Sequence, residues 1–482
     1  MISNIEPQLM WKNFVALNEV PRPSKKEERV IAFIKNFGEK LKLETIEDET
    51  GNVLIKKAAS PGMEDRKTVI LQSHLDMVHQ KNNDTQFDFD QEGIKMFQEG
   101  DWVKAEGTTL GADNGIGVAS IMALLESKDI DHPAIEALFT IDEETGMTGA
   151  FGLQAGFLKG EILLNLDTED DDELTIGCAG GINVSGQGDY ELQNKPDSFV
   201  SLELVLNGLS GGHSGMDIHK GLGNANKLMN RLLMSIGQET ELLLHRIEGG
   251  GLRNAIPRES KAWVAVSNQS KAEAAIVELG KTLKAEYAET DPDLAIEAKV
   301  VEISDQVCSS VFVKNFTASI YAIPVGIYRM SPTVAGMVQT SNNLAQVKMA
   351  DGKFEILCLC RSSVDSEKLD EVNAISSAMA IINAKVDADG DYPGWTPRPQ
   401  SDIVDIMSNL YKEMFNAQPK VMACHAGLEC GIIGSHYPNM DMVSFGPNIR
   451  GAHSPDEKVQ ISSVQKYWAF LLETLKRIPK SD

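Results

Sequence analysis

The sequence has few cysteines and no long apolar run. Six cysteines in 482 residues, without a Cys-x-x-Cys pair, are too few for a disulfide scaffold and favour a reducing compartment. The longest apolar stretch, residues 116–125, is far shorter than the roughly 20 residues that a membrane span requires. The N-terminus has no apolar core of the kind that a secretory signal needs. We therefore expect a cytoplasmic protein that does not enter a membrane.

Basic residues are scarce relative to acidic ones. The chain has 45 Lys and Arg against 70 Asp and Glu, a net charge of −25. Such a surface repels polyanions, so nucleic acids and anionic membranes are not expected partners. The hydrophobic content of 42% is ordinary, and the length is sufficient for two domains or for one domain with a large insertion.

The first third of the chain alternates strand-like and helix-like segments. Residues 9–18 and 118–125 have the apolar pattern of helices, and Ser24-Lys25-Lys26-Glu27 is a capping-box pattern that predicts the start of another helix. Strands are predicted at residues 52–56, 67–73, 137–141 and 162–166. This alternation predicts an α/β domain, in which sites collect at the C-terminal ends of the strands.

His74 and Asp76 follow the apolar run at residues 69–71. Residues two apart in a strand point to the same face, so the two side chains should project together. A carboxylate that accepts one ring N–H of a histidine makes the other nitrogen a better metal ligand. The pair is also compatible with a hydrogen-bonded surface pair, so partners elsewhere in the chain must decide.

Asp113 lies in the segment Gly111-Ala112-Asp113-Asn114-Gly115, just before a helix. The glycines allow a sharp turn and a close approach of another group to the carboxylate. The alternative is that Asp113 caps the following helix, a common role of aspartate.

Acidic residues follow two more predicted strands. Asp142, Glu143 and Glu144 come directly after residues 137–141, and Asp167 follows residues 162–166. Consecutive acids after a buried strand are costly unless a cation or solvent receives them. Of two adjacent glutamates, one can bind a metal while the other faces the attacking water as a general base.

A histidine in the C-terminal part completes a possible ligand set. His453 lies on a loop after the strand-like residues 442–446. Two zinc ions that share one carboxylate need about five nitrogen and oxygen ligands. The sequence offers that number, namely His74, Asp113, Glu144, Asp167 and His453.

These motifs resemble the co-catalytic di-zinc metallopeptidase family related to carboxypeptidase G and aminoacylase. Within it the chain is most similar to the cytosolic aminoacyl-histidine (Xaa-His, or β-alanyl-histidine) dipeptidases. The resemblance also includes Gly208–Gly215, Gly221–Asn226 and Cys424–Gly431 and covers nearly the whole chain. It implies that Asp113 bridges two zinc ions, that His74 and Asp167 complete one site and that Glu144 and His453 complete the other. It further implies that Asp76 orients His74 and that Glu143 is the general base.

The resemblance implies a discontinuous catalytic domain with an inserted α+β lid. The expected boundaries are residues 1–186 and 385–482 for the catalytic domain and 187–384 for the lid. The two halves of the middle region echo one another weakly, which leaves an internal duplication open.

Four polar residues of the middle region become candidates through this resemblance. His213 is expected to stabilise the oxyanion, with His219 as a weaker candidate for contact with the substrate. Asn254 and Arg361 resemble residues that hold the substrate's backbone and terminal carboxylate, and arginine suits a carboxylate because its donors form a fork. The alternative for each is a surface cap or turn residue, which the residues alone favour for Asn254 and Arg361. Outside the lid, Glu429 is a candidate for binding the free amino group of a dipeptide.

The sequence thus predicts metal-dependent hydrolysis of dipeptides, of the Xaa-His type or broader, and the resemblance implies a homodimer. Zinc is the expected metal, with Co²⁺ or Mn²⁺ as alternatives. One competing hypothesis is a related di-zinc amidohydrolase that acts on N-acyl amino acids, such as a deacylase or desuccinylase. Another is a metal-binding protein without turnover, which Glu143 argues against because ligation does not need it.

Overall fold

The computed structural model describes residues 2–304, 306–398 and 400–481, which divide into two compact units. The first unit contains residues 1–177, 397–423 and 428–482, and the second contains residues 178–396 and 424–427. The chain therefore leaves the first unit after residue 177, returns at residue 397, and enters the second unit once more for the short segment 424–427. The assignment of the inserted unit as a lid stays a prediction.

The first unit is built on an eight-stranded sheet with the order β1-β2-β6-β3-β7-β23-β8-β22. Its central strands β6, β3, β7 and β23 run parallel, and β1 and β2 are antiparallel. The bounds of its strands are β1 Glu44–Glu47, β2 Val53–Lys57, β3 Val69–His74, β6 Ile135–Thr140, β7 Ile162–Asn165, β8 Glu173–Cys178, β22 Lys420–Cys424 and β23 Asp441–Ser444. A four-stranded sheet adds β4 Met96–Glu99, β5 Trp102–Ala105, β24 Ile449–Arg450 and β25 Lys458–Gln460.

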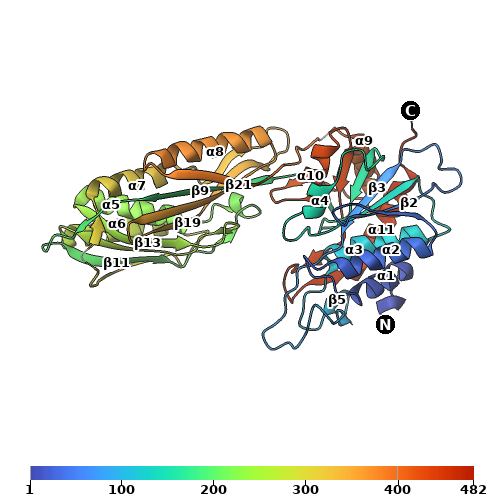
Figure 1. Ribbon diagram of the computed structural model, residues 1–482, viewed down its shortest axis with the longest axis horizontal. Coiled ribbons are helices and arrows are strands. Elements are labelled where there is room, and N and C mark those ends of the chain that lie inside the picture. Colours follow the sequence, from blue (N-terminus) through green and yellow to red (C-terminus); the bar gives the residue numbers. More distant parts are fainter. Residues whose placement is uncertain (1, 305, 399, 482) are drawn as a thin grey trace. The chain divides into compact units, whose positions relative to one another are not determined.

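Helices pack on this sheet and enclose the first core (Figure 1). The parallel strands β3, β6 and β7 are buried along their whole length, as expected for strands covered on both faces. The helices are α1 Gln8–Asn18, α2 Glu28–Lys40, α3 Ala112–Glu126, α4 Thr148–Gly152, α9 Asp402–Phe415, α10 Glu429–His436 and α11 Ile461–Lys476, and a short 3₁₀ helix spans Ile2–Asn4. The predicted α/β class is confirmed.

The capping box predicted at Ser24 is wrong. Helix α2 begins at Glu28, and no side chain caps its first turn. The Ser24 hydroxyl instead donates to Asp76 Oδ2 at 2.8 Å, and a hydrogen bond to a buried carboxylate is a strong one. Ser24 therefore belongs to the surroundings of Asp76.

The second unit contains a nine-stranded sheet, and its helices lie along one face of this sheet (Figure 1). The order is β16-β11-β15-β13-β19-β20-β9-β21, and β18 pairs with β19. Its strands are β9 Gly180–Asp189, β11 Val200–Asn207, β13 Leu242–Gly250, β15 Ser260–Val266, β16 Ala295–Val300, β18 Gly326–Met330, β19 Val338–Ala350, β20 Lys353–Ser362 and β21 Lys385–Tyr392. The two-stranded sheets are β10 Leu192–Asn194 with β17 Gln306–Cys308, and β12 Gly212–His213 with β14 Ala255–Ile256.

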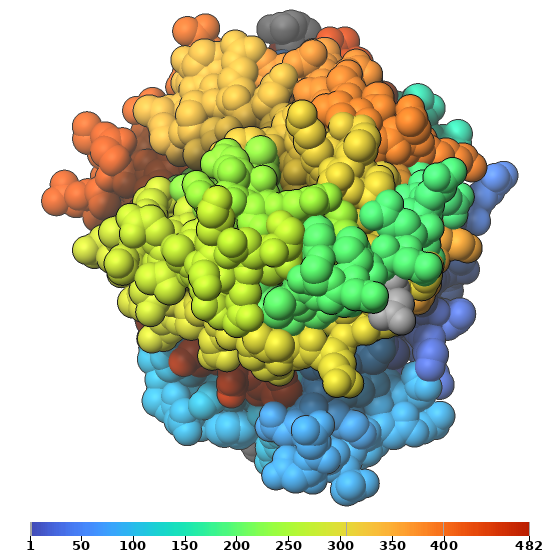
Figure 2. All heavy atoms as spheres, turned by 90° about the vertical axis from the view of Figure 1, so that its left-hand side faces the viewer, coloured from blue at the N-terminus to red at the C-terminus, as the bar shows by residue number. Residues whose placement is uncertain are grey.

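The two halves of the second unit have similar elements at matching places in the sheet. Along the chain the first half runs β11-α5-β13-β15-α6-β16 and the second runs α7-β18-β19-β20-α8-β21, while β9 precedes β11 and takes the place in the second half of the sheet that β11 has in the first. The helices are α5 Ala225–Glu239, α6 Gln269–Glu286, α7 Ser310–Ala322 and α8 Asp365–Ala380, with a 3₁₀ turn at Ile218–Lys220. This order supports the proposed internal duplication. One face of this unit is shown in Figure 2, where its residues are coloured from green to orange.

Within the described residues, no helix combines the length and the apolar character needed to cross a membrane.

Candidate metal centre

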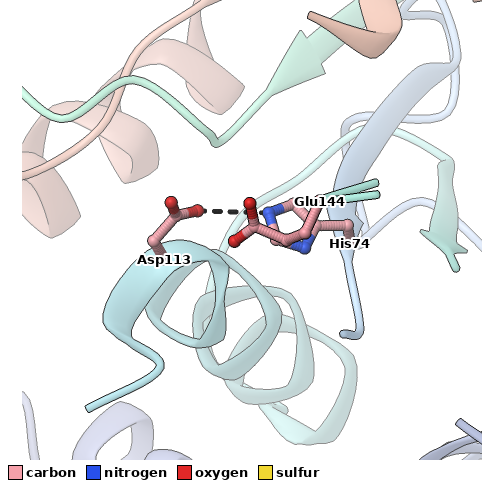
Figure 3. Close-up of side chains that lie close together, drawn as sticks. All are labelled: His74, Asp113 and Glu144. Carbon is pink, nitrogen blue, oxygen red and sulfur yellow. Dashed lines mark hydrogen bonds and ion pairs between the residues drawn. The ribbon is translucent and has the colours of Figure 1, made fainter. Parts of the chain in front are cut away.

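His74 is the last residue of β3, and its ring is 1% exposed. Nε2 lies 3.1 Å from Asp113 Oδ1 and 3.4 Å from Asp167 Oδ1. Asp113 comes from the kinked first turn of α3, and Asp167 comes from the segment that follows β7. Figure 3 shows how His74, Asp113 and Glu144 approach from a strand end, a helix start and a loop. The C-terminal ends of parallel strands thus bring these groups together.

His453 makes the second half of the arrangement. Its Nε2 lies 3.2 Å from Asp113 Oδ2 and 2.9 Å from Glu144 Oε2. Asp113 therefore stands between two histidines and offers one carboxylate oxygen to each. The five predicted ligands lie in two groups of three that share Asp113. The alternative role of Asp113 as a helix cap is wrong, because its side chain accepts no hydrogen bond from the helix N-terminus.

The donor set fits divalent metal ions. Two ligand atoms on a tetrahedral ion with bonds of about 2.0–2.1 Å lie about 3.3 Å apart, and the atoms here are separated by 2.9 to 3.4 Å. Glu144 Oε1 is buried without a hydrogen-bond partner, as is Asp167 Oδ1 apart from its contact with His74. Buried carboxylate oxygens without partners are costly unless a cation receives them.

The electrostatics of the cluster favour positive charge. Hydrogen bonds to Asp113 and Glu144 raise the pKa of His453 to about 11. Burial raises the pKa of Asp167 to about 6. Burial acts in the same direction on Asp113, but hydrogen bonds from His453 and His74 outweigh it and hold the pKa of Asp113 well below its usual range. The group is thus an acidic site that stabilises cations.

Asp76 connects His74 to the loop after β6. Its carboxylate is fully buried and lies 3.4 Å from His74 Nδ1, which is also 3.2 Å from the backbone oxygen of Asp76. Asp76 Oδ1 accepts the backbone N–H of Glu143 at 3.0 Å, and Oδ2 accepts that of Glu144 at 3.3 Å. One carboxylate thus contacts a candidate ligand and orients the backbone of two functional residues.

Glu143 is half-buried, and its carboxylate makes no hydrogen bond or ion pair with any described residue. Burial raises the pKa of Glu143 well above its usual range, with further contributions from Asp167 and Glu144. A carboxylate that is held by its backbone but has a free side chain can accept a proton from a bound reactant.

Glu429, the first residue of α10, is fully buried. Its Oε2 accepts hydrogen bonds from Gln72 Nε2 and Thr140 Oγ1, both at 2.6 Å, and Oε1 has no partner. Burial raises the pKa of Glu429 to about 8. Its predicted contact with the substrate's amino group stays a prediction.

The other candidates belong to the second unit. Arg361 is 6% exposed; its Nη1 donates to Tyr392 Oη at 3.0 Å and its Nε to Ser214 Oγ at 3.4 Å. No carboxylate among the described residues forms an ion pair with it. Asn254 and His219 are exposed, and neither side chain makes a hydrogen bond with a described residue. Arg361 is thus a buried cation whose hydrogen-bond partners are neutral hydroxyl groups.

His213 has a defined tautomer. Its Nδ1 accepts the backbone N–H groups of Gly215 at 3.1 Å and Met216 at 3.0 Å. Burial and the charge of Arg361 lower the pKa of His213. The neutral ring therefore carries its proton on Nε2 and presents a hydrogen-bond donor there.

Two buried residues next to the centre were not found from the sequence as functional candidates. In the sequence Arg22 lies between two prolines where a helix ends, and Glu457 belongs to the motif around His453, so neither position indicates a functional role. Both are at most 2% exposed and contact the turn that carries Asp113. The glycines around Asp113 are the sequence feature that indicates a closely packed neighbour, since they leave room for the Arg22 guanidinium.

Comparisons with known proteins identify the family of the chain. The chain matches peptidase family M20/M25/M40 over residues 70–477. It is 43% identical over 480 residues to the cytosol non-specific dipeptidase of Escherichia coli (strain K12), with 99% of both chains covered.

Two solved structures extend the comparison. The crystal structure of an aminoacylhistidine dipeptidase from Vibrio alginolyticus is 45% identical and superposes with a TM-score of 0.94 over 100% of this chain and 99% of that chain. An aminopeptidase from Bacillus cereus, 16% identical with a TM-score of 0.58 over 98% of this chain and 99% of that one, shows likeness of fold alone. The family resemblance inferred from the motifs is confirmed, and the chain belongs to peptidase family M20/M25/M40.

Proposed function

We propose that this chain is a dipeptidase that uses two divalent metal ions, with zinc as the first candidate. The observation that carries the proposal is the position of Asp113 between His74 and His453, with one oxygen toward each ring. One ion would be held by His74, Asp113 and Asp167, and the other by His453, Asp113 and Glu144. When bound, such ions acidify water and polarise a carbonyl group.

Glu143 is the general base in this proposal. Its carboxylate accepts a proton from the attacking water and later delivers this proton to the nitrogen of the leaving amine. Its backbone N–H is fixed by Asp76 Oδ1 at 3.0 Å, while its side chain is free to follow the proton. Asp76 is a positioning residue that acts through His74 and through the backbone of Glu143.

The second unit supplies the substrate-binding groups in the proposal. His213 donates from Nε2 to the developing oxyanion, because its Nδ1 is already an acceptor for two backbone N–H groups. Arg361 binds the terminal carboxylate of the dipeptide, which its lack of an acidic partner among the described residues supports. Asn254 holds the substrate backbone, with His219 as a further contact.

The substrate class follows from two relatives. One is named a non-specific dipeptidase and the other an aminoacylhistidine dipeptidase. We therefore propose activity on a range of dipeptides that includes Xaa-His. The relative named for the cytosol supports a cytoplasmic location, and a homodimer is proposed from the family resemblance.

A substrate panel tests the proposal. Purified protein is loaded with Zn²⁺ and given dipeptides, including Xaa-His and β-Ala-His, beside N-acetyl and N-succinyl amino acids, with and without a chelator. We expect chelator-sensitive release of amino acids from several dipeptides and much slower turnover of the acylated compounds. Preference for N-acyl amino acids would instead support a deacylase, and the absence of any hydrolysis would contradict both.

A further inference from the structure

Arg22 joins two segments that carry candidate ligands. Its Nη1 donates to the backbone oxygens of Leu75 at 3.1 Å and Asp76 at 3.2 Å, directly after His74. Its Nη2 donates to the backbone oxygen of Gly111 at 2.6 Å, two residues before Asp113, and to Asn18 Oδ1 at 2.9 Å. Arg22 is 1% exposed, so its guanidinium interacts with these protein groups and not with solvent.

Glu457 holds the same turn from the other side. One oxygen accepts the backbone N–H groups of Leu110 at 2.7 Å and Gly111 at 2.9 Å, and the other accepts those of Ala112 at 2.7 Å and Asp113 at 3.3 Å. Four converging N–H groups at a helix start form a strong site for a carboxylate. Because Glu457 follows His453 by four residues, it also ties the His453 loop to this turn.

The two residues meet at Gly111. Arg22 binds its carbonyl group and Glu457 binds its N–H group. A Cβ on Gly111 would lie 2.5 Å from Arg22 Nη2, and a Cβ on Gly115 would lie 2.7 Å from the same atom. Gly111 also has a φ of +68°, which favours glycine. The glycines around Asp113 therefore make room for the guanidinium.

We propose that Arg22 and Glu457 form a clamp that sets metal affinity by fixing the turn Leu110–Asp113, so that the Asp113 carboxylate faces His74 and His453 together. Both are positioning residues, because neither side chain contacts the candidate ligand atoms. The inference rests on the proposed two-ion site. Residues around a metal site that orient its ligands commonly change metal affinity by about 10–100-fold when they are removed.

The test measures metal binding without substrate. Metal-free protein is titrated with Zn²⁺ against a chromophoric chelator, for the wild type, Glu457→Gln and Glu136→Gln. Glu136 is the matched control, since its buried carboxylate also accepts two backbone N–H groups, those of Lys159 at 2.7 Å and Gly160 at 2.9 Å, at the other end of β6. We expect Glu457→Gln to bind both ions at least tenfold more weakly, and Glu136→Gln to bind them like the wild type.

Glu457→Gln leaves one acceptor oxygen for four backbone N–H donors, so some of the hydrogen bonds that hold the turn are lost. A loss of affinity in Glu457→Gln no larger than that in Glu136→Gln would overturn the clamp while leaving the proposed function intact. A wild type that binds fewer than two ions would instead contradict the two-ion site itself.

A second pair of variants keeps the test decisive if Glu457→Gln does not fold. Gly115→Ala leaves the carboxylate in place and forces the guanidinium aside, and Arg22→Lys keeps the charge but loses the fork that reaches both segments. Circular dichroism confirms folding before each titration. We expect at least a fivefold loss of affinity in each, and wild-type affinity in both folded variants would overturn the proposal.

Discussion

The Asp76 carboxylate accepts the backbone N–H of Glu143 at 3.0 Å, and the same carboxylate lies 3.4 Å from the ring of His74. Asp76 thus links a candidate metal ligand to the proposed general base across two neighbouring strands, β3 and β6. The contact holds the backbone of the loop at Glu143, whereas the Glu143 side chain is not held by it. Metal binding and proton transfer can therefore be tested independently.

Glu143→Gln should retain metal and lose turnover. The amide has nearly the shape of the carboxylate but cannot accept the proton of the attacking water. General-base catalysis is commonly worth about 10²–10⁴-fold, so we expect a loss of kcat in that range with both ions still bound. Elemental analysis and steady-state kinetics on the same sample measure this. A metal-loaded variant with more than a tenth of the wild-type kcat would be inconsistent with the role of Glu143.

Asp113→Ala should lose metal rather than only activity. Asp113 is the residue that both groups share, so its removal takes an oxygen ligand from each. We expect the purified variant to contain far less than two ions per chain, measured by elemental analysis after dialysis. Asp172→Ala is the control and should keep its metal, because Asp172 is a partly exposed acid on the loop after β7 that pairs with Lys420 at 3.0 Å. Full occupancy in Asp113→Ala would show that the carboxylate is not a shared ligand.

Arg361→Lys should raise KM for dipeptides without a matching change for dipeptide amides. Lysine keeps the charge but cannot bind a carboxylate with two parallel hydrogen bonds. We expect an increase in KM of about tenfold for the free dipeptide, corresponding to about 1.4 kcal/mol, and little change for its C-terminal amide. Arg246→Lys is the matched control, because Arg246 pairs with Glu248 at the surface. Equal effects of Arg361→Lys on both substrates would argue against carboxylate binding.

Glu371 gives a stability prediction that is independent of the metal centre. The side chain is fully buried in the second unit with the Cys360 thiol as a weak polar partner, and burial raises the pKa of Glu371 from 4.5 to about 8. Between these two pH values the unfolded chain releases the proton while the folded chain keeps it. The free energy of unfolding should therefore fall as pH rises from about 4.5 to about 8, by up to about 5 kcal/mol, and then stay level.

Glu371→Gln removes this dependence. Melting temperatures of the variant and the wild type at pH 5 and pH 8 measure it, and the difference between the two proteins should shift in favour of the variant at pH 8. Glu297→Gln changes an exposed glutamate of the same unit and should show no such shift. A difference that is equal at both pH values would mean that Glu371 is already ionised in the folded protein.

The ligand set could be predicted because each of its members follows a pattern that is visible in the chain. His74, Glu144 and Asp167 lie at or just after apolar strands, and parallel strands bring such ends to one edge of a sheet. Strand positions were predicted to within a few residues, as for β3 at Val69–His74. The pairing of Asp113 with two histidines does not follow from the strand positions and was implied by the family resemblance.

The supporting residues could not be predicted in the same way. The contact of Glu457 with residues 110–113 spans more than 340 positions and depends on how a loop returns to the sheet. The sequence around Ser24 fits the pattern of a helix cap. In the structure its hydroxyl instead donates a hydrogen bond to the carboxylate of Asp76, which is distant in the sequence. Local patterns therefore indicate which groups do chemistry, whereas the groups that orient them emerge only from the tertiary structure.

A metal titration of dipeptide hydrolysis tests the central claim most directly. Metal-free protein, prepared with a chelator and then freed of it, is supplied with increasing Zn²⁺ while release of amino acids from a dipeptide is followed. The account predicts negligible hydrolysis without metal and a rise that saturates near two ions per chain. Full hydrolysis by the metal-free protein, or no hydrolysis at any Zn²⁺, Co²⁺ or Mn²⁺ concentration, would contradict it.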